Sequence, residues 1–157
     1  DGEGCRVSHF VSGCRNHCPG CFNQDIWDFD FGKEFTEVEE NEILEGCNKE
    51  YISGLTILGG EPFEEENQKV IVELIKKFKE KFPKKTLWMY TGYVLDKDLL
   101  PGQRKYVEGV TGLILDSIDV LVDGPFILAE RNLSLKFRGS NNQRILDKEK
   151  IKELRNA

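Results

Sequence analysis

Three of the five cysteines lie close together in the sequence, namely Cys14, Cys18 and Cys21. Three residues separate the first pair and two separate the second, so a single loop can bring three thiolates to one centre. Thiolates are common ligands of zinc and of iron–sulfur clusters. In a cytosolic protein, where thiols stay reduced, such a group of cysteines indicates metal or redox chemistry.

The fourth ligand decides which centre these thiolates form. A structural zinc site is normally closed by four protein ligands, and the fourth would have to be His17, His9 or Cys47. A ferredoxin-type 4Fe–4S cluster also requires four cysteines. Three thiolates alone fit a cubane cluster with one iron left open to a substrate, while zinc and unliganded thiols remain alternatives. Cys5 and Cys47 stand alone in the sequence and are predicted to be small core residues.

Other loops with unusual residues follow predicted strands: Gly59-Gly60-Glu61-Pro62, Thr91-Gly92 and Asp123-Gly124. Ligands gather at the carboxyl ends of strands in α/β folds, so these loops and the cysteine loop predict one site. Gly59 and Gly60 either let the backbone approach a ligand or simply turn the chain. Glu61 could pair with an ammonium group or cap the next turn. Asp123 could orient a ligand hydroxyl or cap the turn at Gly124.

The elements that must position these loops alternate between strand and helix. Strands are predicted at 6–12, 54–58, 86–90 and 119–123. Helices are predicted from the capping box at 36–39 to residue 46 or 47, over 67–82, between 103 and 117, and from the Asp147 cap through residue 155. Such alternation implies a mainly parallel α/β sheet with right-handed crossovers. A complete eight-stranded barrel needs about 250 residues, so we predict a partial, open β/α barrel.

Composition narrows the possible functions. The 157 residues fit one domain, 1–157, and 28 acidic against 22 basic residues give a net charge of −6. This balance argues against a nucleic-acid partner bound through a broad basic surface. No apolar stretch approaches the roughly 18 to 20 residues of a membrane-spanning helix, and no secretory signal is present, so we predict a cytoplasmic protein. The missing initial Met predicts that the extreme N-terminus is absent.

Longer motifs resemble those of one known family. They are Val11-Ser12-Gly13-Cys14, Pro19-Gly20-Cys21-Phe22-Asn23, and the segments 59–62, 88–93, 119–126 and 138–144. The three-cysteine spacing matches the radical S-adenosylmethionine enzymes. The motifs together resemble the anaerobic ribonucleoside-triphosphate reductase-activating proteins, a family of glycyl-radical enzyme activases, over almost the whole chain.

The resemblance implies a cofactor and a cosubstrate. A 4Fe–4S cluster would be held by Cys14, Cys18 and Cys21, and S-adenosyl-L-methionine would bind its open iron. The implied cosubstrate contacts are Gly20, Cys21, Phe22, Gly59, Gly60, Glu61, Thr91 and Gly92. Many members of the superfamily place an aromatic residue before the third cysteine, whereas this chain has Gly20 there and Phe22 after it.

The resemblance also implies a reaction and partners. S-adenosylmethionine would be cleaved reductively to a 5′-deoxyadenosyl radical, which installs a glycyl radical on anaerobic ribonucleoside-triphosphate reductase. The partners would be the glycyl-radical subunit of that reductase and a low-potential electron donor such as flavodoxin. The alternatives are activation of another glycyl-radical enzyme, such as pyruvate formate-lyase, and a non-catalytic zinc-stabilised interaction module. Arg138, Asn142 and Arg144 could hold a carboxylate, dock a partner or form a solvated loop.

Overall fold

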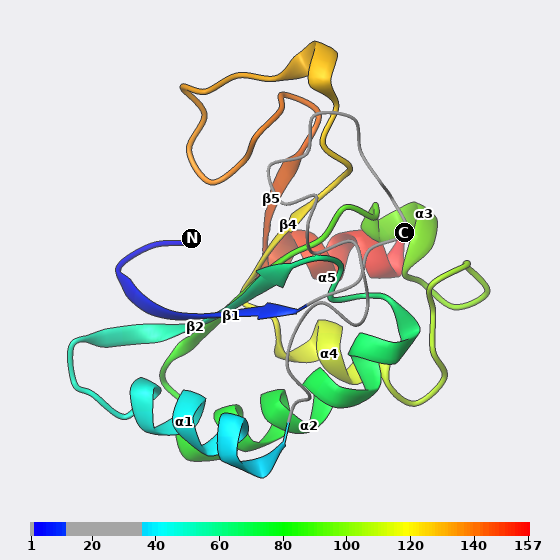
Figure 1. The fold of residues 1–157 in the computed structure, drawn as a ribbon. Helices are drawn as coiled ribbons and strands as arrows, with labels where there is room; N and C mark the ends of the chain where they lie inside the picture. The colour runs from blue at the N-terminus through cyan, green and yellow to red at the C-terminus, as the bar shows by residue number, and fades with distance from the viewer. Residues whose placement is uncertain (1, 12–35) are drawn as a thin grey trace.

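The computed structural model describes residues 2–11 and 36–157, which contain a five-stranded sheet (Figure 1). Its strands are β1 (Cys5–Val11), β2 (Ile52–Gly59), β3 (Thr86–Tyr90), β4 (Val120–Asp123) and β5 (Arg144–Asp147). The spatial order follows the sequence, β1-β2-β3-β4-β5. The first four strands are parallel and β5 is antiparallel to β4. The prediction of an α/β fold with a mainly parallel sheet is therefore confirmed, and the sheet is open.

The helices of the described chain are α1 (Glu37–Cys47), α2 (Glu65–Lys81), α3 (Leu95–Asp98), α4 (Thr111–Ser117) and α5 (Lys148–Asn156), with a 3-10 turn at Leu128–Glu130. Thr36 and Asp147 are confirmed as helix N-caps, whereas Thr36 and Glu39 contact each other through their side chains. The Thr36 hydroxyl accepts from Val38 N–H at 3.3 Å and donates to the Glu39 carboxylate. Asp147 accepts from Lys150 N–H at 2.9 Å. Side chains that satisfy exposed amides in this way set the helix starts.

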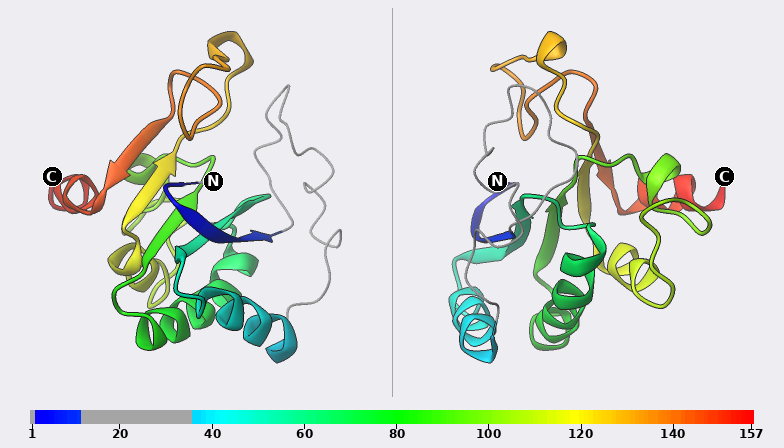
Figure 2. Two further views of the ribbon diagram at one scale, coloured as in Figure 1. Left: turned by 90° about the vertical axis from the view of Figure 1, so that its left-hand side faces the viewer. Right: turned by 45° about the vertical axis from the view of Figure 1, so that its right-hand side comes forward.

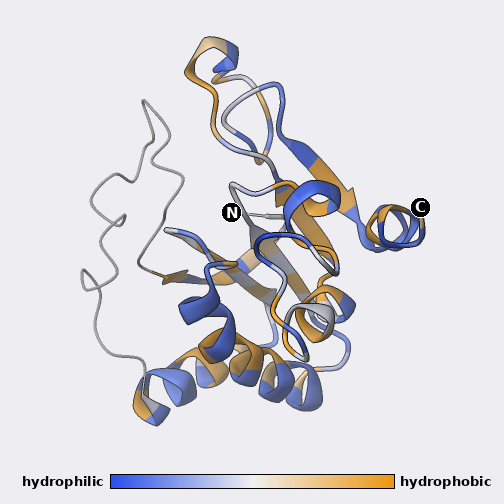
Figure 3. Ribbon diagram, turned by 90° about the vertical axis from the view of Figure 1, so that its right-hand side faces the viewer, coloured by the Kyte–Doolittle hydropathy of each residue, from blue (hydrophilic) through white to orange (hydrophobic). Residues whose placement is uncertain are grey.

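The core lies between the helices and one face of the sheet. Figure 2 shows α1, α2, α4 and α5 on the same side of a curved sheet. Leu55, Ile57, Leu87 and Met89 alternate along β2 and β3 and are completely buried on this side. Figure 3 shows that the helices are amphipathic, with hydrophobic residues interleaved among hydrophilic ones. Burial of these apolar residues is the main stabilising contribution to the fold.

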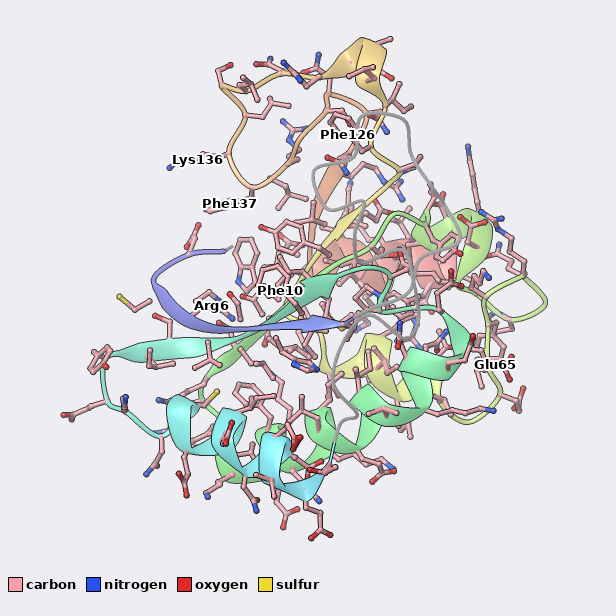
Figure 4. The ribbon with its side chains drawn as sticks, in the orientation of Figure 1. Arg6, Phe10, Glu65, Phe126, Lys136 and Phe137 are labelled. Atoms are coloured by element: carbon pink, nitrogen blue, oxygen red, sulfur yellow. The ribbon has the colours of Figure 1, made fainter. Side chains whose placement is uncertain are left out.

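The other face of the sheet is covered in part by the connection between β4 and β5. Phe137 in this connection packs edge-on against Trp88 of β3, with ring centroids 5.0 Å apart. The Arg6 guanidinium lies 5.7 Å from the Trp88 ring and donates to the hydroxyls of Thr56 and Thr86 at 2.8 Å. Figure 4 shows Phe137 pointing from this connection toward the region of Arg6. The connection therefore folds back over the face opposite the helices.

Three details of the sequence interpretation are wrong. The helix predicted between 103 and 117 begins at Thr111, because Gly109 adopts φ +75° and the preceding residues form turns. Strand β5 and the short helix α3 were not predicted, since each contains few apolar residues. Cys5 is exposed rather than in the core, whereas Cys47 is fully buried as predicted. None of the described helices is long and apolar enough to cross a membrane.

Candidate functional site

The glycine-rich turn after β2 lies against the carboxyl end of β1. Gly59 pairs with Val11 in the parallel register, and Gly60 N–H donates to the Val11 carbonyl at 2.8 Å. Gly59 has φ +119°, and a Cβ there would lie 2.5 Å from the Val11 carbonyl oxygen. Glycine is therefore required at position 59 by both the backbone conformation and the close approach. Cys14, the first cysteine of the motif, is three residues after Val11 in the sequence.

The predicted cluster ligands lie outside the described residues, as do Gly20 and Phe22. Within residues 2–11 and 36–157, no group of three or more His, Cys, Asp or Glu side chains is arranged to hold a metal ion. Cys47, a candidate fourth zinc ligand, belongs to the hydrophobic core. The other described candidate, His9, lies on β1, where burial lowers its pKa.

Glu61 joins the loop after β2 to the loop after β3. Its side chain is fully buried. One carboxylate oxygen accepts from Phe63 N–H at 2.9 Å and from the Thr91 hydroxyl at 2.6 Å. The other oxygen accepts from Gly92 N–H at 2.7 Å. The Thr91 hydroxyl in turn accepts from Tyr93 N–H at 3.1 Å. The carboxylate thus caps its own turn, one of the two roles expected from the sequence, and also holds the neighbouring loop.

Burial makes the contribution of Glu61 to the stability of the protein depend on pH. It raises the pKa of Glu61 from its usual 4.5 to about 7, against the opposing effect of the three hydrogen bonds. A folded-state pKa above the unfolded value means that protonation favours folding. The stabilisation is complete below about pH 4.5 and is lost as the pH rises through about 7.

We therefore expect the free energy of unfolding of the wild type to fall relative to that of Glu61→Gln between about pH 4.5 and 7. The two chains share every other titrating group, so the difference between them isolates Glu61. Denaturant unfolding at a series of pH values measures it. A difference that stays constant or changes in the opposite direction would contradict the raised pKa.

A second buried carboxylate extends the same network. Glu64 accepts from the Tyr93 hydroxyl at 3.0 Å and from Lys105 Nζ at 2.8 Å. Burial and the nearby carboxylates raise the pKa of Tyr93, which therefore stays protonated. The Tyr93 carbonyl accepts from Gly124 N–H at 2.8 Å in the loop after β4. Little in the sequence indicates this role, because Glu64 opens a run of three glutamates that is typical of a solvated helix start.

Asp123 and Arg144 form an ion pair with each other. Asp123 is fully buried and accepts from Arg144 Nε at 2.9 Å and Nη2 at 2.6 Å, a bidentate pair between β4 and β5. It also accepts from Leu95 N–H at 2.8 Å. The carboxylates of Asp123 and Asp96 raise the pKa of Arg144. Both residues were considered from the sequence as ligand contacts, and the structure brings them together as an ion pair.

Arg144→Met is expected to lower the free energy of unfolding by about 3 kcal/mol, because it leaves the buried Asp123 carboxylate without its cation. Adding Asp123→Asn should recover part of this loss, since the amide oxygen can still accept from Leu95 N–H. Urea unfolding of both single variants and the double variant measures the coupling. Additive losses would indicate that the pair contributes nothing beyond its separate residues.

Asn142 and Arg138, the two other polar residues considered from the sequence as ligand contacts, lie in the connection between β4 and β5. Asn142 donates to the Pro125 carbonyl at 2.8 Å and accepts from the Ser140 hydroxyl at 2.6 Å, so it holds the connection together. Arg138 donates to the Gln143 carbonyl at 2.8 Å. Its Nε atom is buried and has no hydrogen-bond partner among the described residues. Asn142 is therefore a structural residue of the loop.

Comparison with known proteins identifies the family. The family described as a 4Fe–4S single cluster domain matches residues 1–146. Three relatives are each named anaerobic ribonucleoside-triphosphate reductase-activating protein. The relative from Enterobacteria phage T4 is 38% identical over 147 residues, covering 92% of this chain and 85% of its own. The Escherichia coli (strain K12) relative is 37% identical over 145 residues, covering 91% and 88%. The Pasteurella multocida (strain Pm70) relative is 40% identical over 148 residues, covering 91% and 87%.

No solved structure gives a significant match. The sequence matches extend over nearly the whole chain, and they agree with the family that its cysteine spacing and loop motifs resemble. The chain therefore belongs to the anaerobic ribonucleoside-triphosphate reductase-activating proteins and contains their 4Fe–4S single-cluster domain.

Proposed function

We propose that this chain is a radical S-adenosylmethionine oxidoreductase, formed by a single domain, that installs a glycyl radical on anaerobic ribonucleoside-triphosphate reductase. The observation that carries the proposal is the contact of Gly60 N–H with the Val11 carbonyl at 2.8 Å. This contact joins the glycine-rich turn to the strand end that precedes the three cysteines in the sequence. The names of the relatives support the reductase as the target.

The donor set suits the cluster that the family's description names. Cys14, Cys18 and Cys21 would supply three thiolates and leave one iron for the amino and carboxylate groups of S-adenosylmethionine. The cluster, when bound, supplies the low-potential electron that cleaves the sulfonium. The part played by the chain is to position the cosubstrate, which is how proteins contribute most to such reactions.

The cosubstrate contacts divide between two groups of loops. Gly20, Cys21 and Phe22 would contribute from the cysteine loop. Gly59, Gly60, Glu61, Thr91 and Gly92 would contribute main-chain groups from the loops after β2 and β3. Gly59 and Gly60 are only partly buried, so their backbone is accessible beside the end of β1. The absence of side chains there allows a ligand to approach the main chain closely.

The proposed reaction balances with one electron. The electron cleaves the bond between sulfur and C5′, methionine leaves with the sulfur lone pair, and a 5′-deoxyadenosyl radical remains. This radical removes a hydrogen atom from a glycine Cα of the reductase, which gives 5′-deoxyadenosine and a glycyl radical. A flavodoxin-type donor would supply the electron in the cytoplasm. The open sheet, as a partial β/α barrel, would admit the glycine segment on the face opposite the helices.

An anaerobic assay tests this function. The reconstituted protein, reductant and S-adenosylmethionine are incubated with the glycyl-radical subunit of anaerobic ribonucleoside-triphosphate reductase or, separately, with pyruvate formate-lyase. We expect methionine, 5′-deoxyadenosine and a glycyl-radical resonance with the reductase. A resonance only with pyruvate formate-lyase would assign the other activase function. A colourless protein that contains zinc and releases no methionine would support the non-catalytic module instead.

A further inference from the structure

We infer that Glu61 is a positioning residue, whose carboxylate fixes the loop after β3 against the glycine-rich turn, and that it does not bind the ammonium group of the cosubstrate. The identity of the cosubstrate rests on the proposed function. The contacts of the carboxylate do not, because all of them lie within the described chain.

Both oxygens of the carboxylate accept hydrogen bonds from donors in two loops. Phe63 N–H and the Thr91 hydroxyl donate to one oxygen at 2.9 and 2.6 Å, and Gly92 N–H donates to the other at 2.7 Å. The side chain has no exposed surface. Because the side chain is completely buried, a ligand ammonium group could reach the carboxylate only by moving the residues that surround it. A buried N–H left without an acceptor by such a movement is costly. The geometry therefore favours a structural role, which we call a brace: the Glu61 carboxylate holds the loop after β3 against the glycine-rich turn.

The exposure of the surrounding residues supports this assignment. Glu61 and Thr91 are buried, and the Thr91 hydroxyl is also used twice, as donor to Glu61 and acceptor from Tyr93 N–H. Gly60 and Gly92 are only partly buried. The side chains of Glu61 and Thr91 are thus buried, while the backbone of the neighbouring glycines remains accessible. A cosubstrate that contacts these loops would meet main-chain groups whose positions depend on Glu61.

The donor pattern explains why the residue is a carboxylate. All three partners donate, and a carboxylate accepts at both oxygens. A glutamine has one amide nitrogen, which would face either Gly92 N–H or the Phe63 N–H and Thr91 pair. The amide nitrogen opposes fewer donors when it faces Gly92 N–H, so Glu61→Gln preserves size and leaves Gly92 N–H without its acceptor. A merely electrostatic partner of an ammonium group would show no such dependence on the loop after β3.

Amide hydrogen exchange tests the brace without any ligand. In Glu61→Gln, Gly92 N–H is expected to exchange about tenfold faster than in the wild type, because it loses its acceptor. Thr91 N–H, which donates to the Val122 carbonyl at 2.9 Å, should change little and serves as the internal control. Glu65→Gln removes the same charge from an exposed side chain and should leave Gly92 unchanged.

Two further variants separate the brace from general destabilisation. Thr91→Ser keeps the hydroxyl and should preserve slow exchange at Gly92. Thr91→Val removes the donor to Glu61 and the acceptor of Tyr93 N–H, and should accelerate exchange in this loop. An unchanged exchange rate of Gly92 N–H in Glu61→Gln would overturn the brace. Equal exchange rates of Gly92 N–H in Thr91→Ser and Thr91→Val would also overturn it.

A binding cycle then distinguishes positioning from direct contact. The reconstituted wild type and Glu61→Gln are titrated with S-adenosylmethionine and with an analogue that carries hydrogen in place of the amino group. A brace predicts that Glu61→Gln weakens both ligands by the same factor. A loss confined to the ligand with the amino group would overturn the inference. If the wild type binds neither ligand, the proposed function fails, while the exchange measurements still decide the role of Glu61.

Discussion

Single replacement of Cys14, Cys18 or Cys21 by alanine is expected to abolish both the iron–sulfur cluster and the cleavage of S-adenosylmethionine. Each variant leaves two neighbouring thiolates, and iron–sulfur clusters are held by more cysteine ligands than that. Within the described residues, no other group of three or more His, Cys, Asp or Glu side chains is arranged to hold a metal ion. Iron and sulfide per chain, the visible absorbance, and the yield of methionine after anaerobic reconstitution measure the loss.

The two remaining cysteines provide matched controls for this prediction. Cys5 is exposed, so Cys5→Ala should leave iron content and stability unchanged. Cys47 is fully buried in the core, so Cys47→Ala should cost about 1 kcal/mol of stability through lost packing while iron content stays normal. If Cys47→Ala lost its iron while Cys18→Ala kept it, the three-cysteine assignment would be wrong.

The placement of the described loops of the candidate site at one edge of the sheet could be predicted from local patterns. Strands β2, β3 and β4 are short, mainly apolar runs, and a glycine lies within two residues after each of them. Their alternation with helices was enough to predict that the loops after them lie at one edge of the sheet. The structure confirms that these loops lie at the same edge of the sheet. Gly60 contacts the end of β1, and Gly124 N–H donates to the Tyr93 carbonyl between the loops after β3 and β4.

The roles of the charged residues at this edge could not be predicted in the same way. Asp123 accepts from an arginine 21 residues away, and Glu61 accepts from Thr91, 30 residues away. Nothing local to either residue indicates these partners, because they are set by which strands lie side by side. Buried loop amides need acceptors, and the nearest carboxylates supply them. Side chains that suggested ligand contacts in the sequence therefore hold the loops in place.

Strand β5 shows the same limit for secondary structure. Its four residues contain one buried apolar side chain, Leu146, which is too little for a periodic signal. The strand forms because Leu146 lies opposite Leu121 on β4 and because Arg144 lies opposite Asp123. Both contacts arise only after the chain has returned through the long connection over the sheet. Tertiary contacts, rather than local preference, determine this strand.

Gly59→Ala is expected to produce the second large effect, a loss of stability together with impaired cluster assembly. Gly59 has φ +119°, a conformation that side chains rarely adopt and that costs about 1 to 3 kcal/mol. A Cβ would also lie 2.5 Å from the Val11 carbonyl oxygen and 2.7 Å from its nitrogen. Overpacking of this kind typically costs about 1 to 3 kcal/mol more. Relief of the contact requires the end of β1 to move away from the turn.

Gly102 provides a control that separates these two contributions. It also has positive φ, +85°, but apart from its two chain neighbours no residue has an atom within 4 Å of the position of its Cβ. Gly102→Ala should therefore show only the backbone cost, with normal iron content. Because Val11 is three residues before Cys14, displacement of the β1 end by Gly59→Ala should lower iron incorporation as well as stability. Urea unfolding and iron analysis of both variants measure the contrast. If the two variants lost the same stability and both kept full iron, the contact between the glycine-rich turn and β1 would not be important for the position of the cysteine loop.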